Sequence, residues 1–193
     1  MKENRMRTEL HRNQVTDAKT VYENLRDAAY HEAGHVVVAR FLGLTIRKVE
    51  IEEDGSGRAD IRYAEHLPLV DQIALCVAGI EAQELFNCPI HQHAALGDYL
   101  KVRELVAGLT DAESYEYRQA GYLRALQILK SRLPEIEALA HQLFNQRRVE
   151  LNGFTQHGFD RADMRSDVSL DMASASGSLV SAAAVLLSAA RTD

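Results

Sequence analysis

The sequence predicts a mainly α-helical domain with a small β-hairpin. Two patterns support this fold class: long stretches with apolar residues at helical spacing, and one pair of short segments that alternate around a glycine-rich turn. The chain has 193 residues, of which 46% are hydrophobic, enough for one domain with a sizeable core. We expect an N-terminal arm at residues 1–20, either frayed or a short helix, the domain at 21–153 and an Ala/Ser-rich C-terminal tail at 154–193.

The first helix of the domain is predicted from about Val21 to Leu42. It should end near Gly43, because glycine suits the left-handed conformation that follows many helices. Gly34 lies inside this helix, where glycine costs up to about 1 kcal/mol relative to alanine. A glycine at such a position indicates that another part of the chain approaches the helix closely there.

The predicted hairpin consists of Ile46–Glu53 and Arg58–Tyr63, on either side of the turn Asp54-Gly55-Ser56-Gly57. In the first segment Val49 and Ile51 alternate with charged residues, as expected of a half-buried strand. One interpretation is a surface ribbon that covers the first helix. The other, given equal weight, is an edge strand that aligns extended substrate by main-chain hydrogen bonds.

Four further helices complete the predicted fold. Pro68 stands where a helix begins, and the run that follows to Phe86 is apolar nearly all round, which predicts burial. A third helix should follow Asp98 and end near Ala107. Two long helices with apolar stripes, about 111–132 and 134–150, are predicted to serve packing.

The first helix carries the pattern H-E-x-x-H at His31, Glu32 and His35. Residues four apart lie on the same helix face, so His31 and His35 present two imidazoles to one point. Two imidazoles and one further ligand can hold a zinc ion with a position open for water. Zinc lowers the pKa of that water, and Glu32 can accept its proton, so the pattern predicts a zinc-dependent peptide hydrolase.

The third zinc ligand is not determined by spacing. Glu81 and Glu84 on the second helix, His91 and His93 in the connector, and Asp98 are all candidates. A carboxylate on a downstream helix is a common solution and modestly favours Glu81, Glu84 or Asp98. We expect His91 and His93 to be exposed loop histidines, with competition for the metal as the alternative.

Four motifs in order resemble the peptidase domain of FtsH-type ATP-dependent zinc proteases. They are HEAGHVVVARFLG, RKVEIE, VAGIEAQELF and GDYLKVRELV, and the resemblance covers about residues 23–153. It implies a zincin-like FtsH-type peptidase domain, a helical bundle in which His31, His35 and Asp98 bind Zn²⁺ and Glu32 is the general base. The substrates implied are unfolded proteins or peptides.

The sequence also departs from that family. Ile80 and Glu81 replace an arginine and an alanine of the family pattern, and the connector at 63–68 is shorter. The ATPase module and transmembrane helices are absent, so we expect any ATPase to act in trans. The family's rings make a homo-oligomer a further expectation. The alternative function is a catalytically idle or weak peptidase-derived metal-binding module that works with a partner.

Composition restricts the partners. The formal net charge of −6 argues against general nucleic-acid binding. No run approaches the roughly 18 apolar residues that a membrane span needs. The first 19 residues are polar and charged, unlike a secretion signal, and the only two cysteines have no C-x-x-C spacing. We therefore expect a cytoplasmic protein.

Overall fold

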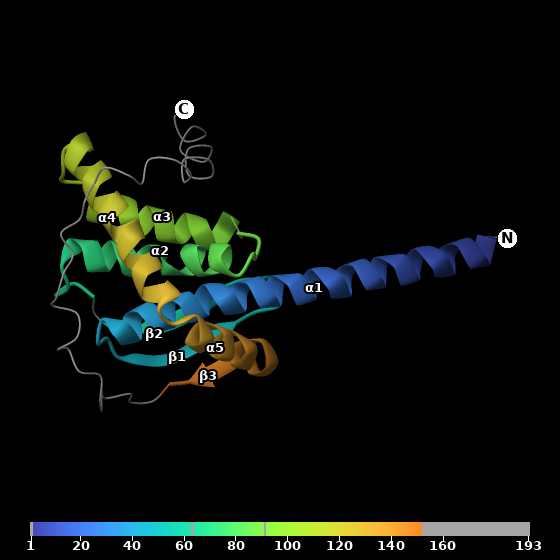
Figure 1. Ribbon diagram of the computed structural model, residues 1–193. Helices are drawn as coiled ribbons and strands as arrows, with labels where there is room; N and C mark the ends of the chain where they lie inside the picture. Colours follow the sequence, from blue (N-terminus) through green and yellow to red (C-terminus); the bar gives the residue numbers. More distant parts are fainter. Residues whose placement is uncertain (1, 63, 91, 152–193) are drawn as a thin grey trace. The chain divides into compact units, whose positions relative to one another are not determined.

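The computed structural model describes residues 2–62, 64–90 and 92–151, with side chains from residue 18 onward except at 91–94. This part of the chain is mainly helical and carries a small antiparallel sheet, as predicted (Figure 1). The predicted tail at 154–193 lies outside the described residues. The elements are α1 (Lys2–Phe41), β1 (Ile46–Ile51), β2 (Gly57–Ile61), α2 (Leu69–Leu85), α3 (Gln92–Leu105), α4 (Asp111–Lys130), α5 (Leu133–Gln146) and β3 (Arg148–Glu150).

Helix α1 begins at Lys2, much earlier than the predicted start near Val21. Residues 2–20 contain no glycine or proline, so nothing in their sequence interrupts the helix. Its end agrees with the prediction. Gly43 has a φ of 76°, its N–H donates to Arg40 O, and the Leu44 N–H donates to Ala39 O over 2.9 Å. These two bonds form a Schellman motif that closes α1.

The three strands form a sheet in the order β2-β1-β3. The hairpin of β1 and β2 confirms the sequence prediction, with Val49 opposite Ala59. Strand β3 was not predicted, because the last helix was expected to continue to Glu150. Helix α5 ends instead at Gln146, and its C-cap residue Arg147, with a φ of 64°, turns the chain. The buried Val149 then pairs with Val49.

Helix α2 is the central element, packed against α1, α3 and α4 (Figure 1). Its predicted burial is confirmed, since Ile73, Ala74, Val77 and Ala78 are all fully buried. The contact with α1 explains Gly34. A Cβ atom there would lie 2.4 Å from Ala78 O and 2.6 Å from Ala82 Cβ, so only glycine allows this approach.

Two apolar cores flank α2. The larger core joins α1, the sheet, α2 and α5, and the smaller one lies where α2, α3 and α4 meet. Helix α3 begins at Gln92, before Asp98 and not after it as predicted, so Asp98 lies inside the helix. The packing predicted for the last two helices is confirmed, with Ala125, Ile128, Ile136 and Leu143 buried at 1% exposure or less.

Candidate metal centre

The two histidines of the H-E-x-x-H pattern lie in the most buried part of α1. His31 is 3% exposed and His35 is 9% exposed, within a segment where Ala33 and Val36 are fully buried. The rings meet edge to face, with centroids 4.8 Å apart, and their Nε2 atoms are separated by 3.1 Å. The shared face predicted from the four-residue spacing is therefore present, and it points into the protein.

Asp98 brings a carboxylate to the same point from α3. Its Oδ2 atom lies 3.1 Å from Nε2 of His31 and 3.1 Å from Nε2 of His35, and its side chain is only 5% exposed. Three potential ligand atoms thus occupy the corners of a nearly equilateral triangle. Among the residues that the structure describes, these three form the only such cluster of metal-ligating side chains.

The far side of each imidazole faces an acceptor. Nδ1 of His35 donates to Leu75 O over 2.9 Å, and Nδ1 of His31 lies 3.1 Å from Gln83 Oε1. In a neutral imidazole only one nitrogen carries a proton. Protons on both Nδ1 atoms leave both Nε2 lone pairs directed at the centre of the triangle, the orientation of metal-binding histidines.

The triangle fits a small cation. Ligand atoms bound to tetrahedral zinc at 2.0–2.1 Å lie about 3.3 Å apart, close to the 3.1 Å separations here. Two imidazole nitrogens and one carboxylate oxygen are also a donor set that zinc accepts. A network of hydrogen bonds among the three side chains alone fits less well, because one proton on His35 Nε2 cannot point at both His31 and Asp98.

The charges of the cluster are strongly coupled. Burial alone would lower the pKa of His35, but the neighbouring Asp98 carboxylate raises it to about 9. Burial would raise the pKa of Asp98, and the imidazoles of His35 and His31 hold it instead well below its usual range. Without a metal, a proton on His35 therefore supplies the positive charge that the carboxylate requires.

Glu32 lies beside the cluster and is 5% exposed. Burial raises the pKa of its carboxyl, an effect that His35 and His31 partly offset. The carboxyl lies against β2: a Cβ atom at Gly57 would be 2.6 Å from Glu32 Cγ and 2.7 Å from Oε1. Gly57 therefore leaves the space that the Glu32 side chain fills.

A cavity of about 690 Å³ opens onto these groups. Its wall combines α1, the hairpin turn, β2, α2 and α3, and Lys101 lies at its rim with Nζ 3.3 Å from Asp98 Oδ1. The lining residues are His31, Glu32, His35, Asp54, Gly55, Ser56, Gly57, Arg58, Ala59, Ile61, Ala64, Leu75, Cys76, Gly97, Asp98 and Lys101. All four residues singled out for catalysis and metal binding thus face one cavity.

Two other candidates for the third ligand, Glu81 and Glu84, are not in the cluster. Glu81 is buried on α2, where burial and the Glu84 carboxylate raise its pKa to about 7, against the opposing effect of Lys130. Glu84 lies on the same helix and interacts with Glu81 rather than with the metal-ligand cluster. His93 lies in α3 and not in the predicted loop, because the helix begins at Gln92. The side chains of His91 and His93 lie outside the described residues, so competition for the metal stays a prediction.

Two residues that support the site were missed by sequence reasoning. Gly79 makes room for an imidazole, since a Cβ atom there would lie 2.5–2.7 Å from three atoms of the His31 ring. Gln83 contacts the same ring from behind. Their signals were a glycine and a glutamine inside the apolar helix α2, where both residues need an explanation.

No protein-family model matches the chain, and a search of curated proteins finds no match either. Within the described residues, none of the helices has the length and apolar character required to cross a bilayer. What the protein does must therefore be inferred from the residues of the cavity.

Proposed function

We propose that the chain is a zinc-dependent endopeptidase that hydrolyses peptide bonds in unfolded proteins or peptides. The single observation that carries this proposal is the convergence of three inward-facing acceptor atoms and the buried Glu32 carboxyl on one open cavity. The four motifs that resemble FtsH-type zinc proteases support the same reading and suggest a zincin-like fold.

His31, His35 and Asp98 would hold the metal. Their ligand atoms are already in place and point inward, so little reorganisation is needed on binding. When bound, zinc would lower the pKa of a water molecule and polarise the scissile carbonyl. Lys101 donates to Oδ1 of Asp98, which leaves Oδ2 facing the imidazoles.

Glu32 would act as the general base and then as the general acid. Its carboxylate would accept a proton from the attacking water and pass that proton to the leaving amine. Burial against Gly57 restricts the carboxyl to one region of the cavity and excludes bulk water from one side of it. Its position beside both histidines in the same cavity supports this role, because the attacking water would be activated there.

Strand β2 offers a way to align the substrate. It is an edge strand, paired with β1 on one side, and Gly57, Arg58 and Ala59 form part of the cavity wall. An extended peptide that added to this edge would run past Glu32 and place its carbonyl groups near the metal ligands. This geometry favours the substrate-aligning interpretation of the hairpin over a purely covering ribbon.

The proposed substrate class follows from this mode of binding. Edge-strand addition requires an extended main chain, which an unfolded protein or a peptide provides and a folded domain does not. Folded substrates would need a separate ATPase to unfold them, the partner in trans that the resemblance suggests. A homo-oligomeric ring is the corresponding proposal for assembly.

Replacing Glu32 with glutamine tests the function. We expect Glu32→Gln to abolish cleavage of casein and to leave zinc bound, because the three ligands are untouched. The matched control is Glu104→Gln, an exposed glutamate on α3 outside the cavity, which should cleave at the wild-type rate. Equal activity in the Glu32→Gln chain and the wild type would disprove the role of Glu32.

The same assay separates the alternative function. A peptidase-derived binding module would retain zinc in the wild type but would cleave neither casein nor peptides. It would instead keep a partner through purification. If the wild type cleaves casein and the Glu32→Gln variant does not, that alternative is excluded.

A further inference from the structure

Gln83 is a polar side chain in the interior of an apolar helix. It lies on α2 and is 1% exposed, among the largest fully buried side chains of the described residues. Burying a carboxamide without hydrogen bonds costs several kcal/mol on apolar transfer scales. A glutamine at this position therefore needs partners for its amide, and the structure supplies three.

The orientation of the Gln83 amide is determined by its partners. Its Nε2 atom donates to Asp27 O over 3.2 Å and to Pro89 O over 3.0 Å. Both partners are main-chain carbonyls, which can only accept, so the NH₂ group must face them. The remaining atom, Oε1, then faces Nδ1 of His31 over 3.1 Å.

This orientation in turn determines the protonation of His31. Oε1 is an acceptor, so Nδ1 of His31 must carry the proton, and Nε2 of the neutral ring keeps its lone pair. The main-chain carbonyl of Leu75 likewise holds a proton on Nδ1 of His35. The two rings therefore differ in one respect: the partner of His35 is backbone, whereas that of His31 is a side chain that can be changed.

We propose that Gln83 is the positioning residue of the metal centre, which fixes the tautomer and orientation of His31 and joins α1 to the connector that leads into α3. The proposal rests on the metal centre described above. Asp27 lies one turn before His31 on α1, and Pro89 lies three residues before the start of α3, the helix that carries Asp98. One amide thus contacts both α1, which carries the two histidines, and the connector to α3, which carries Asp98.

The chemistry explains why the residue is glutamine. Only a carboxamide can accept from an imidazole N–H and donate to two carbonyls at once. A glutamate at this position would direct a second carboxylate oxygen at the two carbonyl oxygens. A methionine would fill the space and leave one donor and two acceptors of the surroundings without their partner.

Zinc affinity measured by competition with a chromogenic chelator tests the proposal. We expect Gln83→Met to bind zinc roughly ten- to hundredfold more weakly than wild type, the usual loss when the partner of a ligating histidine is removed. The matched control is Gln72→Met on the same helix. Gln72 also donates to a main-chain carbonyl, Leu67 O over 2.8 Å, but it does not line the cavity, so its zinc affinity should be unchanged.

The tautomer of His31 is a second readout, which a merely structural role would not move. In ¹⁵N-labelled metal-free protein at alkaline pH, we expect the wild-type His31 ring to carry its proton on Nδ1. In Gln83→Met the proton should shift towards Nε2, where Asp98 Oδ2 remains as an acceptor 3.1 Å away. This measurement needs no bound metal and no activity.

The outcomes are distinguishable. A wild-type His31 ring protonated on Nε2, or a Gln83→Met chain with wild-type zinc affinity, overturns the role of Gln83 and leaves the proposed peptidase intact. A wild type that binds no zinc overturns the metal centre itself. If Gln83→Met does not fold, the wild-type tautomer alone decides between Gln83 as a positioning residue and Gln83 as a packing residue.

Discussion

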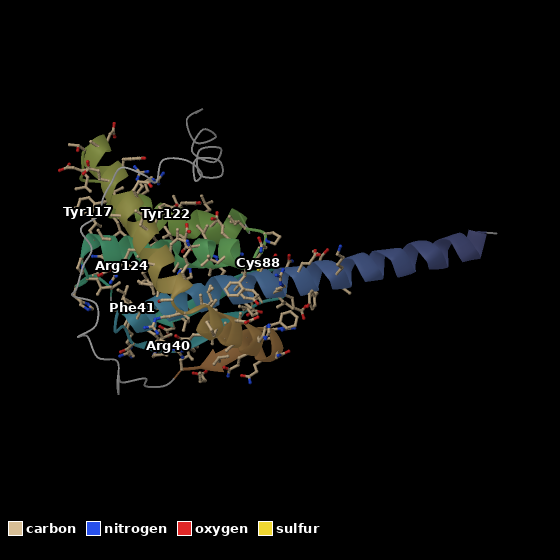
Figure 2. The ribbon with its side chains drawn as sticks, in the orientation of Figure 1. Arg40, Phe41, Cys88, Tyr117, Tyr122 and Arg124 are labelled. Atoms are coloured by element: carbon tan, nitrogen blue, oxygen red, sulfur yellow. The ribbon has the colours of Figure 1, made fainter. Side chains whose placement is uncertain are left out.

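Two clusters of polar side chains lie along α1, and they are built differently. At the end of the helix, the guanidinium groups of Arg124 and Arg132 each lie 5.1 Å from the centroid of the Phe41 ring. Arg124 also contacts Asp71 over 3.0 Å, and Arg132 contacts Glu135 over 3.6 Å. Figure 2 shows Phe41 at the end of α1 with Arg124 above it on α4. Each cation in this cluster has an anion and a ring as partners.

The cluster nearer the middle of α1 is more deeply buried and converges on a single point. His31, His35 and Asp98 direct three acceptor atoms at one point, and their side chains are only 4%, 11% and 5% exposed. The charges at the end of α1 are partly exposed and neutralise one another, which makes them a modest stabilising feature. Two imidazole nitrogens and a carboxylate oxygen gathered out of water around one point are a donor set that a metal cation accepts. We therefore regard the cluster at the end of α1 as structural and the one at His31, His35 and Asp98 as the candidate site.

Metal removal should give the largest difference between the two clusters. We expect a chelator to lower the unfolding free energy of the zinc-loaded chain by about 4 kcal/mol, the linkage value for zinc at a thousandfold excess over its Kd. Denaturant melts with and without chelator measure this change. Asp98→Asn is the control, because a chain without the third ligand should respond little to chelator. Superimposable melts of wild type would contradict a stabilising metal.

Glu81 is a second test, because it is a buried carboxyl on which the repulsion of the Glu84 carboxylate outweighs the attraction of Lys130. Its pKa is raised from 4.5 to about 7 in the folded chain, so folding favours the protonated form. The stabilising effect is complete below pH 4.5 and is lost as the pH rises to about 7. This shift corresponds to roughly 3 kcal/mol.

We therefore expect Glu81→Gln to be more stable than wild type at pH 8, and the difference to vanish near pH 4. Urea melts across this range measure it. Zinc affinity should not change, because Glu81 lies outside the cluster. A stability difference independent of pH would show that Glu81 is not the titrating group.

Gly79 tests how closely the centre is fitted. A Cβ atom there would lie 2.5 Å from His31 Cε1, so we expect Gly79→Ala to displace the ring, weaken zinc binding and cost roughly 1–3 kcal/mol. Gly121→Ala is the matched control. Its Cβ would lie 2.4 Å from Ile73 Cγ2, in the smaller core, so it should cost a similar amount of stability without weakening zinc binding. Equal zinc affinities in the two variants would argue against a preformed site.

The arginine cluster should give the smallest effect. We expect Arg124→Met to lower the unfolding free energy by about 1 kcal/mol or less, because one partly exposed ion pair and one cation–π contact are lost. Zinc affinity and casein cleavage should stay at wild-type values. A loss of zinc binding in this variant would mean that the two clusters are coupled through α1.

Local patterns predicted much of the fold. Helical spacing identified the faces of α1 and α2, the glycine-rich turn identified the hairpin, and Gly34 indicated the close contact with α2. Strand β3 could not be predicted in the same way, because it follows a non-glycine residue in the left-handed conformation, Arg147, and is defined by pairing with β1. The early starts of α1 and α3 were missed because neither begins with a clear capping residue.

Local patterns also predicted one part of the site. His31, Glu32 and His35 follow from spacing within one helix, whereas Asp98 is more than 60 residues away in sequence and contacts His35 only through the packing of α3. Spacing alone left five candidates for the third ligand, and the resemblance selected Asp98. Gln83 and Gly79 act through contacts between α1 and α2, which no local pattern encodes.

The most direct test of the metal centre is elemental analysis. The purified chain is equilibrated with zinc, freed of unbound metal and then analysed for zinc. Three acceptor atoms directed at one point predict one zinc ion per wild-type chain and none in the Asp98→Ala chain. Wild-type protein that retains no zinc, or an Asp98→Ala chain that retains as much as wild type, would contradict the account.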